Sequence, residues 1–162
     1  MPRAYVRGAT LLEVVVVLGI LGVVFAFTWS AAGSLARRLA LRAAGTVLVS
    51  ELRAAQARAI AEHRSGRSHG IAFAVGADRY TVIVREGSRR TPGRVVRLPS
   101  GVRTTYARFG GGSPQTAMFS ASSLFGAPSG AGTVTLQAGG SRLCVRVVPA
   151  TGRIRVANTG CP

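Results

Sequence analysis

Apolar and polar positions divide the chain into a long helical N-terminal part and a C-terminal part of short strands. From Val14 to Ala36, 23 consecutive residues carry no charge, and roughly 20 apolar residues are enough for a helix to cross a bilayer. A secretory signal peptide has a shorter apolar region, about 7–15 residues, and ends in an A-x-A-like site, so we interpret this stretch as a retained span. Arg3 and Arg7 precede it, and the positive-inside rule then keeps the N-terminus in the cytoplasm.

The helix is expected to continue beyond this span with a different surface pattern. Residues 34–63 contain no proline and one glycine, Gly45, and their leucines recur at helical spacings among arginines and alanines. We therefore expect one helix from about residue 10 to about 63. Residues 9–33 form its transmembrane half, and residues 34–63 form an amphipathic half that packs against a domain.

Residues 64–162 have the sequence pattern of short strands separated by turns that contain glycine and proline. The segment Arg64–Gly70 is expected to end the helix. Strands are expected at Ile71–Val75, Tyr80–Arg85, Arg94–Leu98, Ala117–Ser120, Thr133–Ala138, Leu143–Val148 and Arg153–Ala157. The predicted fold class is α+β, with one long N-terminal helix packed on an antiparallel β-sheet head.

The composition of the chain excludes most classes of enzyme. The 162 residues include 21 Lys+Arg, all arginine, against 5 Asp+Glu, a net charge of +16. Acid–base catalysis needs positioned carboxylates or histidines, and beyond residue 63 only Asp78, Glu86 and His69 remain. We expect no enzymatic activity, no cofactor and no metal site at His63 and His69. The apolar content of 48 % also excludes a disordered basic tail.

The residues Arg7-Gly-Ala-Thr-Leu-Leu-Glu13, just before the apolar run, resemble the type III signal of type IV prepilins and pseudopilins. The resemblance implies that residues 1–8 are a leader peptide, which prepilin peptidase removes by cutting between Gly8 and Ala9. It also implies that the new N-terminal residue, Ala9, is methylated; most family members have phenylalanine there. Thr10 and Glu13 would then take part in subunit assembly.

Glu13 is a functional candidate on physical grounds as well, because a carboxylate at the edge of a long apolar run is costly in a bilayer. In a filament, this glutamate can neutralise the free amine of a neighbouring subunit. The alternative is a glutamate that snorkels to the surface in an ordinary membrane anchor.

The C-terminal half carries a second resemblance. The segments Phe119–Gly126, Gly132–Leu136, Val145–Val147 and Thr151–Arg155 look like the GspH/FimT family of minor pseudopilins. The implied partners are prepilin peptidase, other minor and major pilins or pseudopilins, and the inner membrane before assembly. The implied location is a single-pass inner-membrane protein with a periplasmic or extracellular head, and a pilus or pseudopilus after assembly.

The arginines of the head point to a polyanionic partner. From Arg64 onward there are 14 arginines and two acidic residues, and outside the cytoplasm this surplus favours double-stranded DNA. Within it, we interpret one cluster either as a mobile basic loop or as a second phosphate contact: Arg85, Arg89, Arg90, Arg94 and Arg97.

Strand periodicity places the main cluster. If the last two expected strands form a hairpin across Pro149–Gly152, four arginines share its outward face while Ile154 and Val156 face the core. These arginines are Arg142, Arg146, Arg153 and Arg155. Some FimT-like pilins bind DNA through a Gly-Arg-x-Arg element near the C-terminus, and Gly152–Arg155 matches it residue by residue.

The two cysteines, Cys144 and Cys161, can pair in an oxidising compartment, and two free thiols are the alternative. A bridge would lay residues 158–162 beside the arginine face, because Cys144 alternates with Arg142 and Arg146.

Three functions remain open at this stage. The first is a DNA-binding minor pilin of a type IV pilus or natural-transformation system. The second is a structural pseudopilin of a type II secretion system. The third is a bitopic membrane protein unrelated to filaments.

Overall fold

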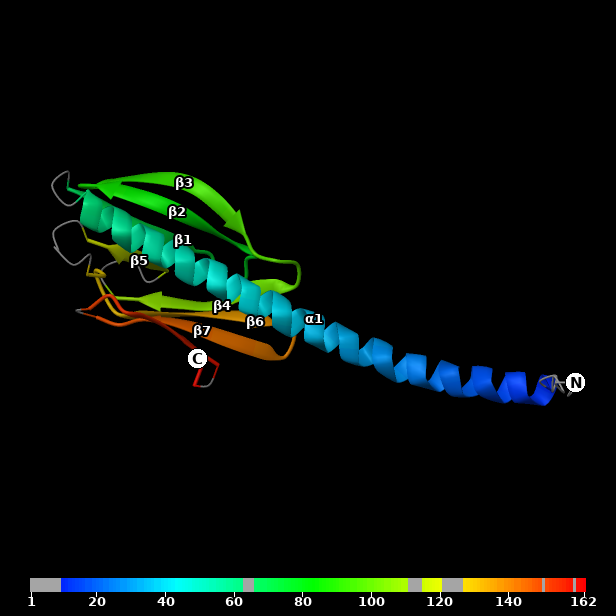
Figure 1. Ribbon diagram of the computed structural model, residues 1–162. Coiled ribbons are helices and arrows are strands. Elements are labelled where there is room, and N and C mark those ends of the chain that lie inside the picture. The colour runs from blue at the N-terminus through cyan, green and yellow to red at the C-terminus, as the bar shows by residue number, and fades with distance from the viewer. Residues whose placement is uncertain (1–9, 63–65, 111–114, 121–126, 150, 159) are drawn as a thin grey trace, which may run out of the picture. The chain divides into compact units, whose positions relative to one another are not determined.

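The computed structural model describes residues 10–62, 66–110, 115–120, 127–149, 151–158 and 160–162, with only the backbone of residues 27–32 (Figure 1). In this described part, the chain forms one helix and eight strands: α1 (Leu11–Ala61), β1 (Arg67–Phe73), β2 (Arg79–Glu86), β3 (Arg89–Arg97), β4 (Val102–Phe109), β5 (Thr116–Phe119), β6 (Gly132–Ala138), β7 (Ser141–Val147) and β8 (Ile154–Ala157). The chain divides into two compact units, residues 1–36 and 37–162.

The first unit contains the beginning of α1. Thr10 caps the helix, because its Oγ1 accepts a hydrogen bond from the backbone N–H of Glu13 at 3.3 Å. Large apolar side chains along this part of the helix are exposed, Leu11 at 84 % and Phe25 at 70 %.

Among the described residues, no helix has the length and hydropathy of a segment that crosses a membrane. The expected span over residues 9–33 includes Ala9 and the side chains of residues 27–32, which lie outside the described part.

In the second unit, the rest of α1 is amphipathic and forms one wall of the core. Its buried side chains recur every three or four residues and face the sheets: Leu41, Ala44, Leu48, Leu52, Ala55 and Ala59. Gly45 lies against Leu143, and a Cβ there would come within 2.9 Å of the leucine Cδ2. A side chain at this position would therefore require Leu143 to shift. The long helix expected over residues 10–63 is confirmed, with bounds at Leu11 and Ala61.

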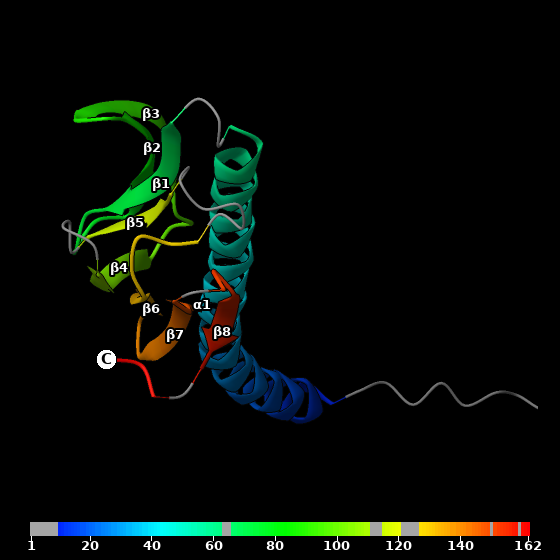
Figure 2. The same ribbon diagram turned by 90° about the vertical axis from the view of Figure 1, so that its left-hand side faces the viewer.

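The β-structure consists of two antiparallel four-stranded sheets, in place of the single sheet that was expected. One sheet has the order β3-β2-β1-β5 and the other the order β4-β6-β7-β8. Both lie on the same side of α1 (Figure 2), and the apolar side chains of their inner faces join those of the helix in one core. The expected α+β class is confirmed at this level.

Several strand bounds differ from expectation. Strand β1 begins at Arg67, inside the segment that was expected to be a break, and β3 begins at Arg89 instead of Arg94. Strand β4 was not expected at all. Val156 was expected to face the core, yet it is 51 % exposed because β8 is an edge strand.

Candidate nucleic-acid interface

The expected hairpin of β7 and β8 is present. The N–H of Val148 donates to the carbonyl of Arg153 at 2.9 Å, and the N–H of Gly152 donates to the carbonyl of Val148 at 3.1 Å. Gly152 has a φ of 63°, a left-handed conformation that costs a non-glycine residue about 1–2 kcal/mol. The glycine of the Gly-Arg-x-Arg element therefore closes the turn that places the two arginines after it.

Arg146 of β7 and Arg155 of β8 lie directly opposite each other in this hairpin. Both are exposed, and residues opposite each other in a ladder project from the same face. Arg153 immediately precedes β8, two residues before Arg155, and is also exposed. Like charges at directly opposed positions destabilise a sheet, so fold stability does not account for this pairing.

The cluster extends across the sheet to a residue that sequence reasoning missed. Arg108 of β4 is paired with Thr133 of β6, which is paired with Arg146, so that Arg108, Thr133, Arg146 and Arg155 form one row across four strands. With strands about 4.8 Å apart, this row is about 14 Å wide. Its signal in the sequence was weak, because Arg108 lies on the strand that was not expected.

Arg142 belongs to a different place on the same face. It is opposite Gln137 of β6, which in turn is opposite Arg103 of β4, and it lies four residues, about 13 Å, from Arg146 along β7. Instead of joining Arg146 and Arg155, Arg142 lines a hollow of about 230 Å³ together with Arg38 and Arg42 of α1. We call the five exposed arginines of the three strands, with Arg153, the arginine face: Arg103, Arg108, Arg142, Arg146, Arg153 and Arg155.

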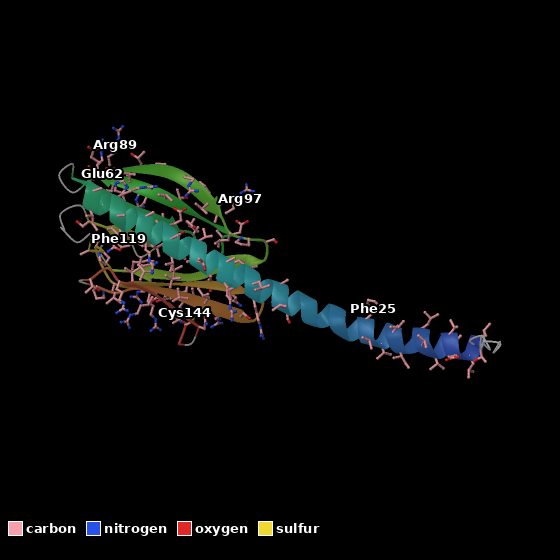
Figure 3. The ribbon with its side chains drawn as sticks, viewed as in Figure 1. Phe25, Glu62, Arg89, Arg97, Phe119 and Cys144 are labelled. Atoms are coloured by element: carbon pink, nitrogen blue, oxygen red, sulfur yellow. A yellow bond between two sulfur atoms is a disulfide. The ribbon has the colours of Figure 1, made fainter. Side chains whose placement is uncertain are left out.

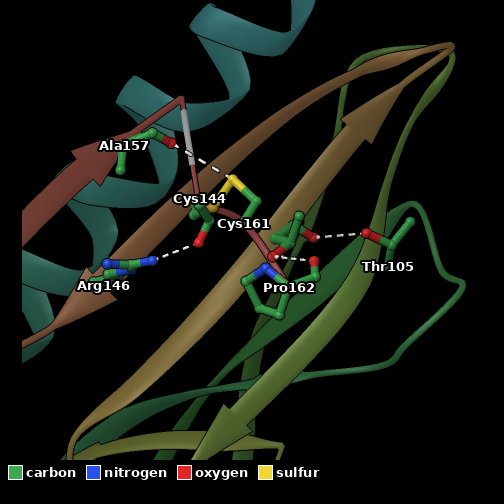
Figure 4. The surroundings of a disulfide bond; sticks show 8 residues. Thr105, Cys144, Arg146, Ala157, Cys161 and Pro162 are labelled. Carbon is green, nitrogen blue, oxygen red and sulfur yellow. Dashed lines mark hydrogen bonds between the residues drawn. A yellow bond between two sulfur atoms is a disulfide. The ribbon is translucent and has the colours of Figure 1, made fainter.

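The described residues of the C-terminal tail, 158 and 160–162, lie between the two rows. Cys144 and Cys161 form a disulfide with their Cα atoms 5.6 Å apart (Figure 4). Arg146 Nη2 donates to the carbonyl oxygen of Gly160 at 2.5 Å, and the Thr135 hydroxyl lies 3.5 Å from the carbonyl oxygen of Pro162. Cys144 and Thr135 are on the outward side of their strands yet fully buried, because the tail covers them.

No Asp or Glu side chain forms an ion pair with the arginine face in the part of the chain that the structure describes. The ion pairs found there join Arg67 to Glu86 at 3.6 Å, Arg94 to Glu51, and His69 to Glu62 at 3.2 Å. All of these lie elsewhere on the second unit. In Figure 3, nitrogen-tipped side chains project from the side of the β6–β7 sheet that faces away from α1.

The second arginine cluster lies on strands β2 and β3, so its interpretation as a loop is wrong, while its role as a second phosphate contact stays a prediction. Arg89 and Arg90 begin β3, Arg94 is paired with Glu51, and Arg90 Nη2 donates to Thr116 Oγ1 at 3.1 Å. Arg97 is opposite Arg79 of β2, and both are exposed. Arg79 and Arg97 are directly opposite each other on their sheet, as Arg146 and Arg155 are on theirs. The pair therefore provides a matched control for the experiments below.

The remaining candidate residues lie mainly near the N-terminus. Gly8 and Ala9, the expected cleavage and methylation positions, and His63 lie outside the described residues. Thr10 and Glu13 form the first turn of α1, where the carboxylate is near the positive end of the helix dipole. Across the described positions, no three side chains of the types that bind metals come together.

Comparisons with family models, with curated proteins and with solved structures return no match for this chain.

Proposed function

We propose that this chain is a minor pilin or pseudopilin of the GspH/FimT type, a non-enzymatic filament subunit that binds the DNA backbone through its arginine face. The observation that carries the DNA-binding part is the row formed by Arg108, Thr133, Arg146 and Arg155, which crosses a whole sheet and has no Asp or Glu side chain paired to it among the described residues. Such an arrangement is destabilising on its own and becomes favourable when phosphates neutralise it.

Phosphate contacts of this kind position a protein on DNA and carry no direct sequence information. We therefore expect weak sequence preference and strong dependence on salt. Natural transformation and type IV pili are the systems in which a filament subunit with this property has a use. The uncharged run of residues 14–36 supports a membrane-inserted form before assembly.

The test compares two pairs of opposed arginines in the full-length chain, purified in a neutral detergent. Arg146→Gln with Arg155→Gln removes the central pair of the row, and Arg79→Gln with Arg97→Gln removes an exposed, opposed pair from the other sheet. Fluorescence anisotropy with a labelled duplex should show a loss of affinity of about tenfold for the first variant and much less for the second. Equal losses would mean that bulk charge alone explains binding.

If the wild-type chain binds no duplex even at low salt, the DNA-binding function is wrong, and the structural pseudopilin of a type II secretion system becomes the better account.

The filament part of the proposal has its own test in Glu13. Glu13→Ala should leave processing at Gly8 intact but lower the amount of the chain in sheared filaments, because only the neutralisation of a neighbour's amine is lost. Glu86→Ala is the matched control, since it removes an exposed carboxylate from β2 and leaves Glu13 in place. Unchanged filament content in the Glu13 variant would contradict the assembly role, and an intact mass that retains residues 1–8 in the native host would contradict the pilin assignment.

A further inference from the structure

One end of the arginine face is hollowed into an open groove of about 840 Å³. The strand positions that line it include Tyr106 and Arg108 of β4, Thr133 of β6 and Arg146 of β7, and the chain leaving β7 adds Val148 and Pro149. Small-molecule sites typically have volumes of about 300–1,000 Å³, so this groove is large enough for a group the size of a nucleotide.

The groove combines two kinds of lining. Arg108 and Arg146 are exposed and lie two strand spacings apart, about 10 Å, so they can contact phosphates on either side of one nucleotide. The same groove is also lined by the half-buried Tyr106 and by the apolar side chains of Val148 and Pro149. A duplex backbone would use the arginines alone, because the faces of its bases are stacked inside the helix.

Tyr106 is placed to meet a base. It is opposite Thr135 of β6, one position beyond the register shift between Thr104 and Tyr106, and it is next to Arg108 on the outward side of β4. The disulfide-bound tail covers Thr135, whereas Tyr106 still lines the groove. Aromatic side chains next to arginines are the usual platform on which unpaired bases stack.

We propose that this groove binds one unpaired nucleotide, with the base against Tyr106 and the flanking phosphates on Arg108 and Arg146, so that the protein prefers single-stranded or frayed DNA ends over uninterrupted duplex. This inference rests on the proposed DNA-binding function and names the form of DNA that the site selects. Binding at a duplex end requires unstacking of the terminal base, which costs least where the base is already unpaired.

The experiment separates base from phosphate by using two probes of equal charge. The full-length chain in neutral detergent is titrated into a labelled 12-nucleotide thymidine oligomer and into a 12-unit oligomer of abasic sites with the same phosphates. Stacking of one base favours the thymidine oligomer by at least about fivefold. Tyr106→Leu should abolish this ratio and leave the affinity for the abasic oligomer unchanged, and Tyr106→Phe should retain the ratio.

The control variant, Arg79→Gln with Arg97→Gln, should leave the ratio at the wild-type value. Equal affinity of the wild-type chain for the two oligomers would overturn this inference and leave backbone binding by the arginine face standing. Absence of binding to either oligomer at low salt would overturn the inference and the proposed DNA-binding function together. A ratio that survives in Tyr106→Leu would show that the groove does not hold the base.

Discussion

Tyr80 is a single buried residue that makes the free energy of unfolding of the head depend on pH. Its side chain is 1 % exposed, and its hydroxyl has no hydrogen-bond partner among the described residues. Burial raises the pKa of Tyr80 from 10.0 to about 12, with the charge of Glu51 adding to the rise and that of Arg94 opposing it. Between these two pH values, the unfolded chain loses a proton that the folded chain retains.

The free energy of unfolding should therefore fall as pH rises through the window from about 10 to about 12. Tyr80→Phe should remove this contribution and, since it deletes an unpaired hydroxyl, should leave stability at pH 7 unchanged or raise it by up to about 1 kcal/mol. Urea denaturation of both proteins at pH 7, 9 and 11 measures the effect. A Tyr80→Phe variant with the same decline as the wild type would assign the decline to other groups.

At the scale of single elements, the turn between β7 and β8 depends on one glycine. Gly152→Ala forces a side chain into a left-handed conformation, with a φ of 63°, and should cost about 1 kcal/mol of stability. It should also lower DNA affinity, because the turn holds Arg153 and Arg155 in place.

The control for this change is Gly87→Ala in the turn between β2 and β3. Gly87 has a φ of 58°, and no other atoms lie within 4 Å of a Cβ added there, so the strain is similar and the site is on the other sheet. Thermal denaturation should show similar losses for both variants, while anisotropy should show weaker DNA binding for Gly152→Ala alone. Equal affinities of the two variants would show that the turn does not position the arginines.

We expect the disulfide that attaches the C-terminal tail to contribute more to the free energy of unfolding than to DNA affinity. Cys161→Ser removes a disulfide that closes a separation of 17 residues, and bridges of this loop size are worth about 3 kcal/mol. Release of the tail also frees Arg146 Nη2 from the carbonyl of Gly160. We expect a lower denaturation midpoint with undiminished affinity for DNA; a loss of affinity as large as that of the Arg146 and Arg155 variant would assign the tail a direct binding role.

The elements differ in how far the sequence could predict them. The helix was predictable, because the leucine spacing of residues 34–63 and the lack of proline permit little else. Strand β4 was not, because a register shift between Thr104 and Tyr106 breaks the two-residue alternation that identifies a strand. The expected start of β3 was too late, at Arg94, because Pro92 and Gly93 are residues typical of turns. An edge strand tolerates proline, and the ladder has an irregularity there.

Part of the candidate site could likewise be predicted from the sequence, and part could not. Arg146, Arg153 and Arg155 could be grouped from local alternation along a hairpin. With only two cysteines, Cys144 and Cys161 were the one possible pair, but the sequence left free thiols open as well. Arg103 and Arg108 could not be added, because only the pairing of β4 with β6 brings them to the same face. The separation of Arg142 from Arg146 by the tail likewise depends on tertiary structure.

For the whole molecule, a net charge of +16 attracts any polyanion, so binding by itself does not identify a site. A specific DNA-binding site differs from general charge attraction in the number of phosphates that it neutralises at one place. Each contributes about −0.9 to the slope of log K against log salt concentration for duplex DNA.

The most direct test is therefore the salt dependence of duplex binding for the full-length chain and two variants with equal charge. Replacement of Arg108, Arg146 and Arg155 by glutamine removes the arginines of one row, and replacement of Arg79, Arg89 and Arg97 removes three from the other sheet. The account predicts that the first variant flattens the slope by about 2 to 3 units, while the second leaves it close to the wild-type value. Equal flattening in both variants would contradict the claim that the arginine face is the DNA-binding site.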